Sequence, residues 1–280
     1  MPESLEKSTK SARELLRMPE QAYRNAEKRA GVVRTRVRVD PTDPNDRKRV
    51  EEHDEKSRNS ANPLKNVSDL FEAVFIDLID RLKLFGENTE VRYSPYDDLE
   101  NGVDAIVLVK NPEGRILLAF GLDVTFGNME IDGKFGRIKS EIDTRTLASI
   151  KYPGENESRV DSVPRCIVAL NLATVSHLVR LWASNDESSE KILRGHPAIR
   201  MILTEISDEL KTFAKYSKET GFFQAVAEFS RAHKHFESLI AQLPPPSIEV
   251  TEDIAFDAVI FKLEHFAEIK PQPHKSRSKR

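Results

Sequence analysis

Two neighbouring apolar segments constrain the fold of this chain most. Residues 105–109 (Ala-Ile-Val-Leu-Val) and 116–120 (Ile-Leu-Leu-Ala-Phe) have the length of strands and are apolar at every position. A sheet that contains them must therefore be covered on both faces. The residues between them, 111–114 (Asn-Pro-Glu-Gly), are typical of a tight turn. The pattern predicts a hairpin of two central strands, over 103–110 and 115–125.

The elements predicted around this hairpin give a mixed α/β chain. Residues 66–85 place apolar side chains at helical spacing, and Gly86 follows as a helix stop. Residues 165–171 form another apolar segment, which indicates a further buried strand. In chain order we expect a helix over 66–85, a strand over 90–94, a polar turn over 95–102, the hairpin, a helix over 135–150, a strand over 165–171 and a helix over 173–182.

Composition divides the chain into four parts. At the N-terminus we expect a helix-compatible stretch over 5–30 that is broken at Pro19, a half-buried or edge strand over 33–39, and a linker over 40–62, whose charged, Pro, Asn and Ser residues favour disorder. Near the C-terminus residues 188–243 are strongly helical, three prolines follow them, and 251–269 fit either a strand or a helix. The expected parts are a charged, partly disordered region (1–65), an α/β core (66–185), a mostly helical extension (186–270) and a basic disordered tail (271–280).

The charge of the chain changes sign along its length. Residues 1–65 carry a net charge of +4 and residues 271–280 another +4, whereas the part between them carries −11. Nucleic acid binds largely through clustered Lys and Arg, so an acidic middle needs the basic ends or a local patch to bind it. No apolar run approaches the roughly 20 residues of a membrane span, and the first ten residues are too charged for a secretory signal. We therefore expect a cytoplasmic protein without a membrane partner.

Common catalytic signatures are missing from the sequence. The single cysteine, Cys166, excludes a disulfide framework and a Cys-clustered metal site within one chain. Residues 127–134 imitate a phosphate-binding loop, but the glycine spacing is one residue too long and Phe135 replaces the required Ser or Thr. His233 and His235 point to different faces of a predicted helix. These patterns predict no site.

Two aspartates interrupt the apolar hairpin. Asp104 begins its first strand and Asp123 closes its second, so the turn at 111–114 brings them close together. Burying carboxylates is costly unless a cation or hydrogen-bond donors compensate, and a bound Mg²⁺ would relieve their mutual repulsion. The alternative is structural: Asp104 caps the turn after Gly102, and Asp123 accepts backbone hydrogen bonds where its strand ends.

The element order and the positions of these acids resemble the restriction-endonuclease-like PD-(D/E)XK phosphodiesterase superfamily over about residues 66–183. Residues 102–104 (Gly-Val-Asp) look like its first motif, and residues 123–125 (Asp-Val-Thr) look like its second. In that family the two strand acids hold a divalent metal, a lysine assists the attacking water, and a glutamate on the first helix often completes the site. The resemblance implies a core of helix, three strands, helix and strand, with a helical C-terminal extension here. It also implies that both motif aspartates and Glu72, which borders the apolar face of the first helix, bind Mg²⁺ or Mn²⁺.

One position departs from the family pattern. Thr125 stands where the family has its lysine, and a neutral hydroxyl cannot stabilise the charge of a pentavalent phosphate. In this superfamily the lysine is known to move to the following helix, so Lys139 or Lys134 is the expected replacement. We favour Lys139, because it lies within the predicted helix whereas Lys134 lies at its start. Thr125 shares a strand face with Asp123, so it either orients a metal-bound water or is simply a residue that suits a strand.

Two functions follow from these expectations. The first is a metal-dependent nuclease for DNA or RNA, in which the hairpin aspartates hold Mg²⁺ or Mn²⁺ and Glu72 binds the metal or positions water. In it, Lys139 or Lys134 neutralises the charge that develops on the phosphate. The second is a catalytically inactive protein of the same fold that binds nucleic acid, or binds a protein partner through residues 188–243. Many members of the resembled superfamily act as dimers, so the resemblance also leaves a homodimer open.

Overall fold

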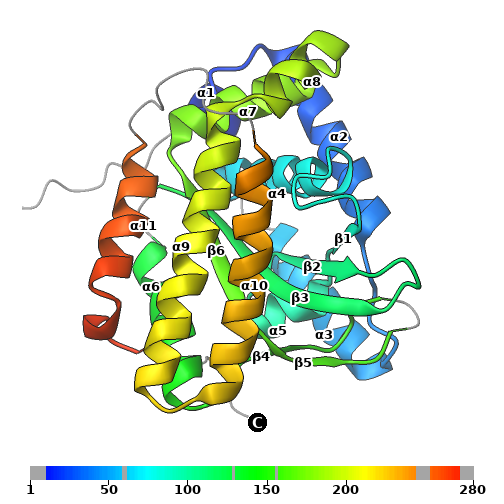
Figure 1. Ribbon diagram of the computed structural model, residues 1–280. Helices are drawn as coiled ribbons and strands as arrows, with labels where there is room; N and C mark the ends of the chain where they lie inside the picture. The colour runs from blue at the N-terminus through cyan, green and yellow to red at the C-terminus, as the bar shows by residue number, and fades with distance from the viewer. Residues whose placement is uncertain (1–10, 59–61, 128–129, 155–156, 244–252, 272–280) are drawn as a thin grey trace, which may run out of the picture.

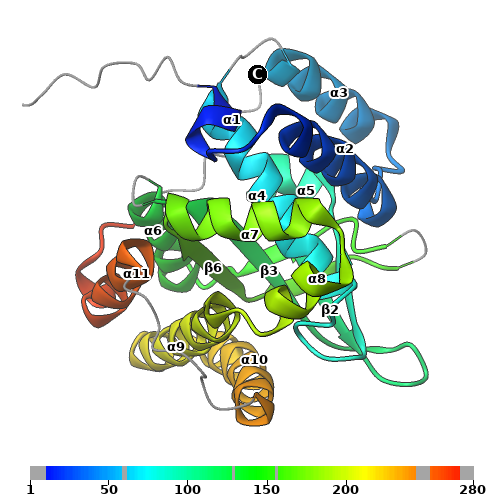
Figure 2. The same ribbon diagram turned by 90° about the horizontal axis from the view of Figure 1, so that it is seen from above.

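The computed structural model is a mixed α/β fold in which helices cover both faces of a four-stranded sheet (Figures 1 and 2). It describes residues 11–58, 62–127, 130–154, 157–243 and 253–271. None of the helices within these described ranges is long and apolar enough to cross a membrane.

The predicted hairpin forms the middle of the sheet. Strands β2 (Ala105–Lys110) and β3 (Ile116–Phe126) pair antiparallel around the turn at 111–114, as expected. The outer strands are β1 (Thr89–Arg92), antiparallel to β2, and β6 (Arg165–Leu170), parallel to β3. The strand order is therefore β1-β2-β3-β6. Strands β4 (Ala148–Ile150) and β5 (Val160–Val163) form a separate small sheet.

Helices α4 (Pro63–Asp80) and α6 (Ile131–Asp143) come before and after the first three strands of the sheet in chain order. Helix α4 precedes β1, and helix α6 lies between β3 and β6. The α4 helix begins at a cap, because the Asn62 side chain accepts a hydrogen bond from the Leu64 N–H. The other helices are α1 (Ala12–Leu15), α2 (Glu20–Val37), α3 (Pro44–Arg58), α5 (Pro95–Asn101), α7 (Leu172–Ser184), α8 (Glu187–Arg194), α9 (Pro197–Glu219), α10 (Phe223–Gln242), α11 (Ile254–Glu264) and the 3₁₀ helix η1 (Phe266–Glu268).

Two clusters of buried apolar side chains pack against the four-stranded sheet. In the larger cluster the rings of Phe85, Phe120 and Phe236 pack together, with centroids 5.8, 5.3 and 5.0 Å apart. The smaller cluster packs Ile106 and Ala119 of the hairpin against β4 and β5. Neighbouring residues of β3 thus enter different clusters, so this strand is buried on both faces, as the sequence predicts.

The N-terminal prediction of an edge strand over 33–39 is wrong. Helix α2 continues to Val37, and strand character is confined to one bridge between Arg38 and Tyr93. The apolar residues of this stretch fit an alternating pattern and a helical pattern at once, and burial against the core selects the helix. The buried residues recur at helical spacing: Ala26, Ala30, Val33 and Val37.

The linker predicted over 40–62 is also wrong for most of its length, since α3 covers residues 44–58. This helix is charged, but its Asp46 is buried against Lys151 and accepts a hydrogen bond from the Tyr152 hydroxyl at 2.7 Å. Those partners lie far along the chain, so no local pattern contains them. Residues 59–61 lie outside the described residues, as does all but Pro271 of the predicted basic tail.

Other elements differ from the sequence-based prediction in their type of secondary structure or in the residues at which they begin and end. The polar turn over 95–102 is helix α5, capped by the Ser94 side chain. The helix expected over 135–150 begins earlier and ends at Asp143, because Arg145 takes a positive φ of 56° that no helix continues through. Most of the ambiguous stretch 251–269 is helical, as α11 and η1.

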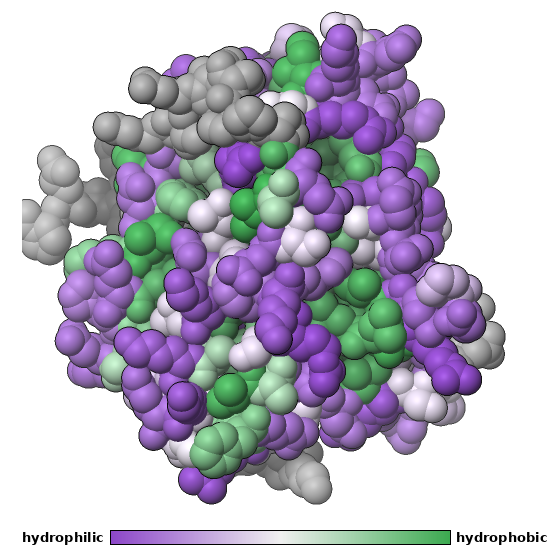
Figure 3. Space-filling view, viewed as in Figure 1, coloured by the Kyte–Doolittle hydropathy of each residue, from purple (hydrophilic) through white to green (hydrophobic). Residues whose placement is uncertain are grey.

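Residues 188–243 are mostly helical, as predicted, in α8, α9 and α10. Figure 1 shows α9 and α10 side by side in front of the sheet. On this face the apolar side chains form separate patches among hydrophilic ones (Figure 3). Exposed Phe223 and Phe261 lie on α10 and α11. Apolar residues scattered in this way are ordinary for a protein surface and do not by themselves indicate a partner.

Three acidic side chains cover the backbone of the edge strand β6. Glu209 and Glu205 of α9 accept hydrogen bonds from the N–H groups of Ile167 (2.7 Å) and Ala169 (3.0 Å). Asp253 accepts from the N–H of Asn171, at 3.0 and 3.2 Å. The three acids are buried, so the outer edge of β6 is closed by side chains where another strand would pair.

We expect Glu209→Gln to flatten the pH dependence of stability. Burial raises the pKa of Glu209 well above its ordinary value, the nearby Glu205 raises it further, and the Ile167 N–H lowers it in part. Because the folded-state pKa exceeds the unfolded one, stability is greatest below the unfolded pKa of 4.5 and is lost as pH rises through the folded pKa. Glutamine keeps the acceptor without the charge, so the free energy of unfolding should fall less between mildly acidic and mildly basic pH.

Urea denaturation at several pH values measures this effect, with Glu209→Ala for comparison. The alanine variant lacks both the charge and the acceptor for the Ile167 N–H, so it should be about 1–3 kcal/mol less stable than Glu209→Gln at every pH. Equal pH slopes in the wild type and Glu209→Gln would show that Glu209 does not titrate in this range.

Candidate functional site

The two hairpin aspartates lie together at one end of the central strands. The N–H of Asp104 donates to the Leu122 carbonyl at 2.9 Å, which places Asp104 opposite the part of β3 that carries Asp123. One carboxylate oxygen of Asp104, Oδ2, accepts from the Val124 N–H at 2.6 Å. Asp123 is buried, and Asp104 is half-buried. The hairpin thus holds both side chains in place through backbone contacts.

Lys134 joins the two carboxylates. It lies in the first turn of α6, and its ammonium contacts Asp123 Oδ1 and lies 3.8 Å from Asp104 Oδ2. The Val124 carbonyl accepts a further, longer hydrogen bond from Nζ at 3.4 Å. A single positively charged group therefore spans both acids, so their separation is within the reach of one cation.

The charges of this cluster depend on burial. Burial raises the pKa of Asp104 well above its ordinary value; Lys134 opposes this, whereas Asp123, Glu72 and Asp98 add to it. For Lys134, burial alone would lower the pKa, but the charges of Asp123 and Asp104 outweigh it and raise the pKa. Lys134 therefore remains protonated at neutral pH and acts as a fixed positive charge rather than as a base.

Glu72 lies near the aspartates but does not join them. Its Oε2 accepts from Arg34 of α2 at 2.7 Å, and its Oε1 accepts from the Ser68 hydroxyl at 3.3 Å. Burial raises the pKa of Glu72 to about 7, against the opposing charge of Arg34. In the described part of the chain, no three His, Cys, Asp or Glu residues come close enough to hold one metal ion. The expected third ligand is thus engaged by an arginine.

Lys139, the lysine favoured from the sequence, lies away from the acids. Its ammonium binds Asp143 at 2.7 Å and stands 5.0 Å from the centre of the Tyr216 ring. Five helical residues rotate a side chain by roughly 140°, so Lys139 and Lys134 cannot share a face of α6. The expected helix began too late, which made Lys134 look marginal. Because the helix begins at Ile131, Lys134 is the lysine that reaches the strand acids.

Thr125 has the position that strand alternation predicts. It lies two residues beyond Asp123 on β3, is buried, and is in register with Ala169 of β6. The structure thus brings together Asp104, Asp123 and Lys134, with Thr125 on the same strand face as Asp123. Glu72 and Lys139 each have other ionic partners.

Sequence reasoning missed three charged neighbours of the acids. Arg137 Nη1 lies 3.7 Å from Asp123 Oδ2, and Arg34 binds Glu72. Asp98 of α5 accepts from the Tyr93 hydroxyl at 3.4 Å; burial raises its pKa to about 6. The spacing of Arg137, three residues after Lys134, could have indicated a shared helix face. No local sequence pattern places Arg34 or Asp98 near the acidic residues of the site, because their positions depend on how α2 and α5 pack.

Asp104 and Asp123 supply two hard oxygen donors of the kind that a divalent cation binds. Mg²⁺ prefers hard oxygen ligands and is commonly bound through one or two carboxylates, with water and phosphate oxygens completing its shell. The ammonium that contacts both carboxylates shows that positive charge is stabilised between them. Oδ2 of Asp104 is held by a backbone N–H, so Oδ1 is the oxygen left for a ligand.

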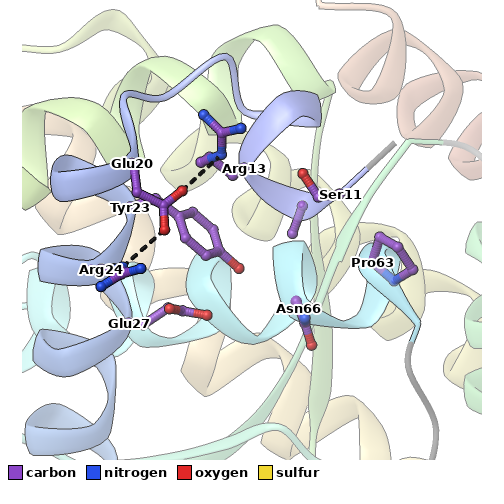
Figure 4. A pocket seen from close by; sticks show the side chains of 9 residues that line it. Ser11, Arg13, Glu20, Tyr23, Arg24, Glu27, Pro63 and Asn66 are labelled. Atoms are coloured by element: carbon purple, nitrogen blue, oxygen red, sulfur yellow. Dashed lines mark hydrogen bonds and ion pairs between the residues drawn. The ribbon is translucent and has the colours of Figure 1, made fainter. Parts of the chain in front are cut away.

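A cavity of about 480 Å³ between α1, α2 and α4 contains none of these residues (Figure 4). Glu20 pairs there with Arg13 at 3.1 Å and with Arg24 at 2.8 Å, and Tyr23 points from α2 toward Asn66. Glu20 thus neutralises one arginine of α1 and one of α2 at the edge of this cavity. It offers a polar space without a reactive group.

No protein-family model, no curated protein and no solved structure matches this chain. The aspartates and the lysine between them therefore carry the functional argument.

Proposed function

We propose that this chain is a metal-dependent nuclease built on a restriction-endonuclease-like core. The observation that carries the proposal is the contact of one ammonium, that of Lys134, with both Asp123 and Asp104. Thr125 replaces the motif lysine in the sequence, and Lys134 brings a lysine back to the same acids from the following helix. The order α4, β1, β2, β3, α6 and β6 supports the same assignment, with α5 inserted after β1 and the small β4–β5 sheet inserted after α6.

In the proposed reaction, water attacks the phosphorus of a phosphodiester and one P–O bond breaks, with a proton ending on the leaving oxygen. Asp104 and Asp123 would hold the divalent ion, which when bound polarises the phosphate and lowers the pKa of its water. Lys134 stays protonated and offsets the negative charge that develops on the phosphate oxygens. The backbone N–H on Asp104 Oδ2 keeps that carboxylate oriented.

Cleavage of single- and double-stranded DNA and RNA, with Mg²⁺ or with EDTA, tests the proposal. We expect Mg²⁺-dependent cleavage, and we expect Lys134→Met to lower kcat/KM about 100-fold, because removing one charge-stabilising donor typically costs 10²–10³. Lys139→Met is the matched control, since Lys139 belongs to the same helix but binds Asp143. Its activity should remain within about twofold. Cleavage that persists in EDTA, or equal loss in both variants, would refute this role for the site.

One observation favours a second function, that of a non-catalytic protein on the same fold. Lys134 already neutralises the acids, so the three side chains can be stable without a metal. Titration calorimetry with Mg²⁺ and Mn²⁺ separates the two functions. A wild-type protein that binds neither ion and cuts nothing would favour the non-catalytic reading, with nucleic acid or a protein as its partner.

A further inference from the structure

Arg137 presents an exposed guanidinium beside the buried carboxylates. Its side chain is 35% exposed, against 7% for Asp123, 16% for Asp104 and 11% for Lys134. It lies one turn after Lys134 on α6, so the two side chains differ in direction by only roughly 60°. The most accessible charge at the two aspartates is therefore the one that sequence reasoning missed.

Most of the hydrogen-bonding capacity of Arg137 is unused. Both of its contacts involve Nη1, which lies 3.4 Å from the Gly102 carbonyl and 3.7 Å from Asp123 Oδ2. Its Nε and Nη2 groups donate to no described residue. Arg165 offers a contrast, because it reaches the same carbonyl at 3.2 Å but is fully buried and paired with Glu141 at 2.9 Å. Arg165 is a structural residue, whereas Arg137 has donors available to a ligand.

Gly102 makes room for this guanidinium. A Cβ at position 102 would overlap Arg137 Nη1, the movable end of a long side chain, so a larger residue there would displace the guanidinium from its present place. The φ of +63° at Gly102 independently favours glycine. The chain between α5 and Asp104 is thus shaped to admit the Arg137 head group next to the first aspartate.

We propose that Arg137 binds the non-bridging oxygens of the phosphodiester that is to be cut. This inference rests on the proposed nuclease function. Lys134 is engaged by the acids, while the planar guanidinium of Arg137 has two adjacent N–H groups that suit paired phosphate oxygens.

Binding without cleavage isolates this role. Fluorescence anisotropy with a short labelled single strand and a short labelled duplex, in Ca²⁺ instead of Mg²⁺, would compare the wild type with Arg137→Met, Arg137→Lys and Arg180→Met. We expect Arg137→Met to weaken binding about tenfold and to reduce the salt slope by about one, as for the loss of one phosphate contact. Lysine should restore part of the affinity. Arg180 is an exposed arginine on α7 and serves as the control.

The outcomes separate this inference from the proposed function. If the wild type binds the oligonucleotides but cuts neither DNA nor RNA, and Arg137→Met still weakens binding, the phosphate subsite stands and the nuclease assignment falls. If Arg137→Met and Arg180→Met bind equally well, the subsite is refuted even if the wild type is an active nuclease. A wild type that binds neither probe refutes it as well. Unfolding free energies within about 0.5 kcal/mol of wild type would exclude a folding defect.

Discussion

Replacing Asp123 by asparagine should abolish cleavage while leaving the protein folded. Asp123 contributes one of the two carboxylates proposed to hold the metal, and it is the acid that contacts both Lys134 and Arg137. Asparagine has the same shape but lacks the charge, so it should lose the metal and release the lysine. We expect activity to fall at least ~1,000-fold, because the metal and the oriented lysine are lost together.

The measurement combines a cleavage assay with Mg²⁺ calorimetry on the same samples. Asp161→Asn is the matched control, since Asp161 lies on β5, is 66% exposed and pairs with Arg159. This control should bind metal and cut like the wild type. An Asp123→Asn protein that still cleaves at a tenth of the wild-type rate would contradict the assignment, since a metal ligand cannot be dispensable. Loss of cleavage with unchanged Mg²⁺ binding would instead place the metal elsewhere.

The second large effect concerns stability. Asp77 of α4 accepts hydrogen bonds from Arg29, Arg36, Arg81 and the Trp182 indole, at 2.9, 2.9, 3.2 and 2.8 Å. Its side chain is only 2% exposed. Asp77→Ala would leave several arginines without their shared anion in a partly buried place. Breaking a buried ion pair by removing one partner typically costs ~3–5 kcal/mol, and we expect a loss of that size.

Urea denaturation of Asp77→Ala and Asp80→Ala tests this expectation. Asp80 also binds Arg36, at 2.9 Å, but it is 28% exposed, so its loss should cost less than ~1 kcal/mol. Burial would raise the pKa of Asp77, but the hydrogen bonds of Trp182 and Arg36 and the nearby positive charges outweigh it and lower the pKa. The stabilisation is therefore present above the unfolded pKa of 3.8 and is lost as pH falls through the folded value. Equal losses in the two variants would contradict the central role given to Asp77.

The sequence predicts the sheet better than the layers around it. The strands of the hairpin and β6 each contain an uninterrupted run of five apolar residues, and a short turn connects β2 and β3, so local patterns suffice to find them. The N-terminal helices depend on partners far along the chain. Asp46 meets Lys151 and Tyr152, and the arginines of α2 meet Asp77, which no window of neighbouring residues contains.

The candidate site could also be predicted only in part, because only some of its residues are brought together by local structure. Asp104 and Asp123 could be paired because the hairpin register follows from one turn. The choice of lysine required the first residue of α6, and helix starts are poorly defined when no side chain caps them, as at Glu130. The engagement of Glu72 by Arg34 required the packing of α2 on α4. The local sequence pattern is therefore enough to predict that the two aspartates lie together. Which charged side chains contact them depends on tertiary packing.

The acids that cover β6 also limit how this protein can assemble. Two copies of a chain often join by aligning their sheet edges into one continuous sheet, which needs free N–H groups along the outer strand. Here Glu205, Glu209 and Asp253 occupy those groups, and α9 would have to move away before a second β6 could approach. A dimer that extends the four-stranded sheet would therefore have to form at its far edge, β1. Strand β1 is only four residues long, so it offers few backbone groups for such a pairing.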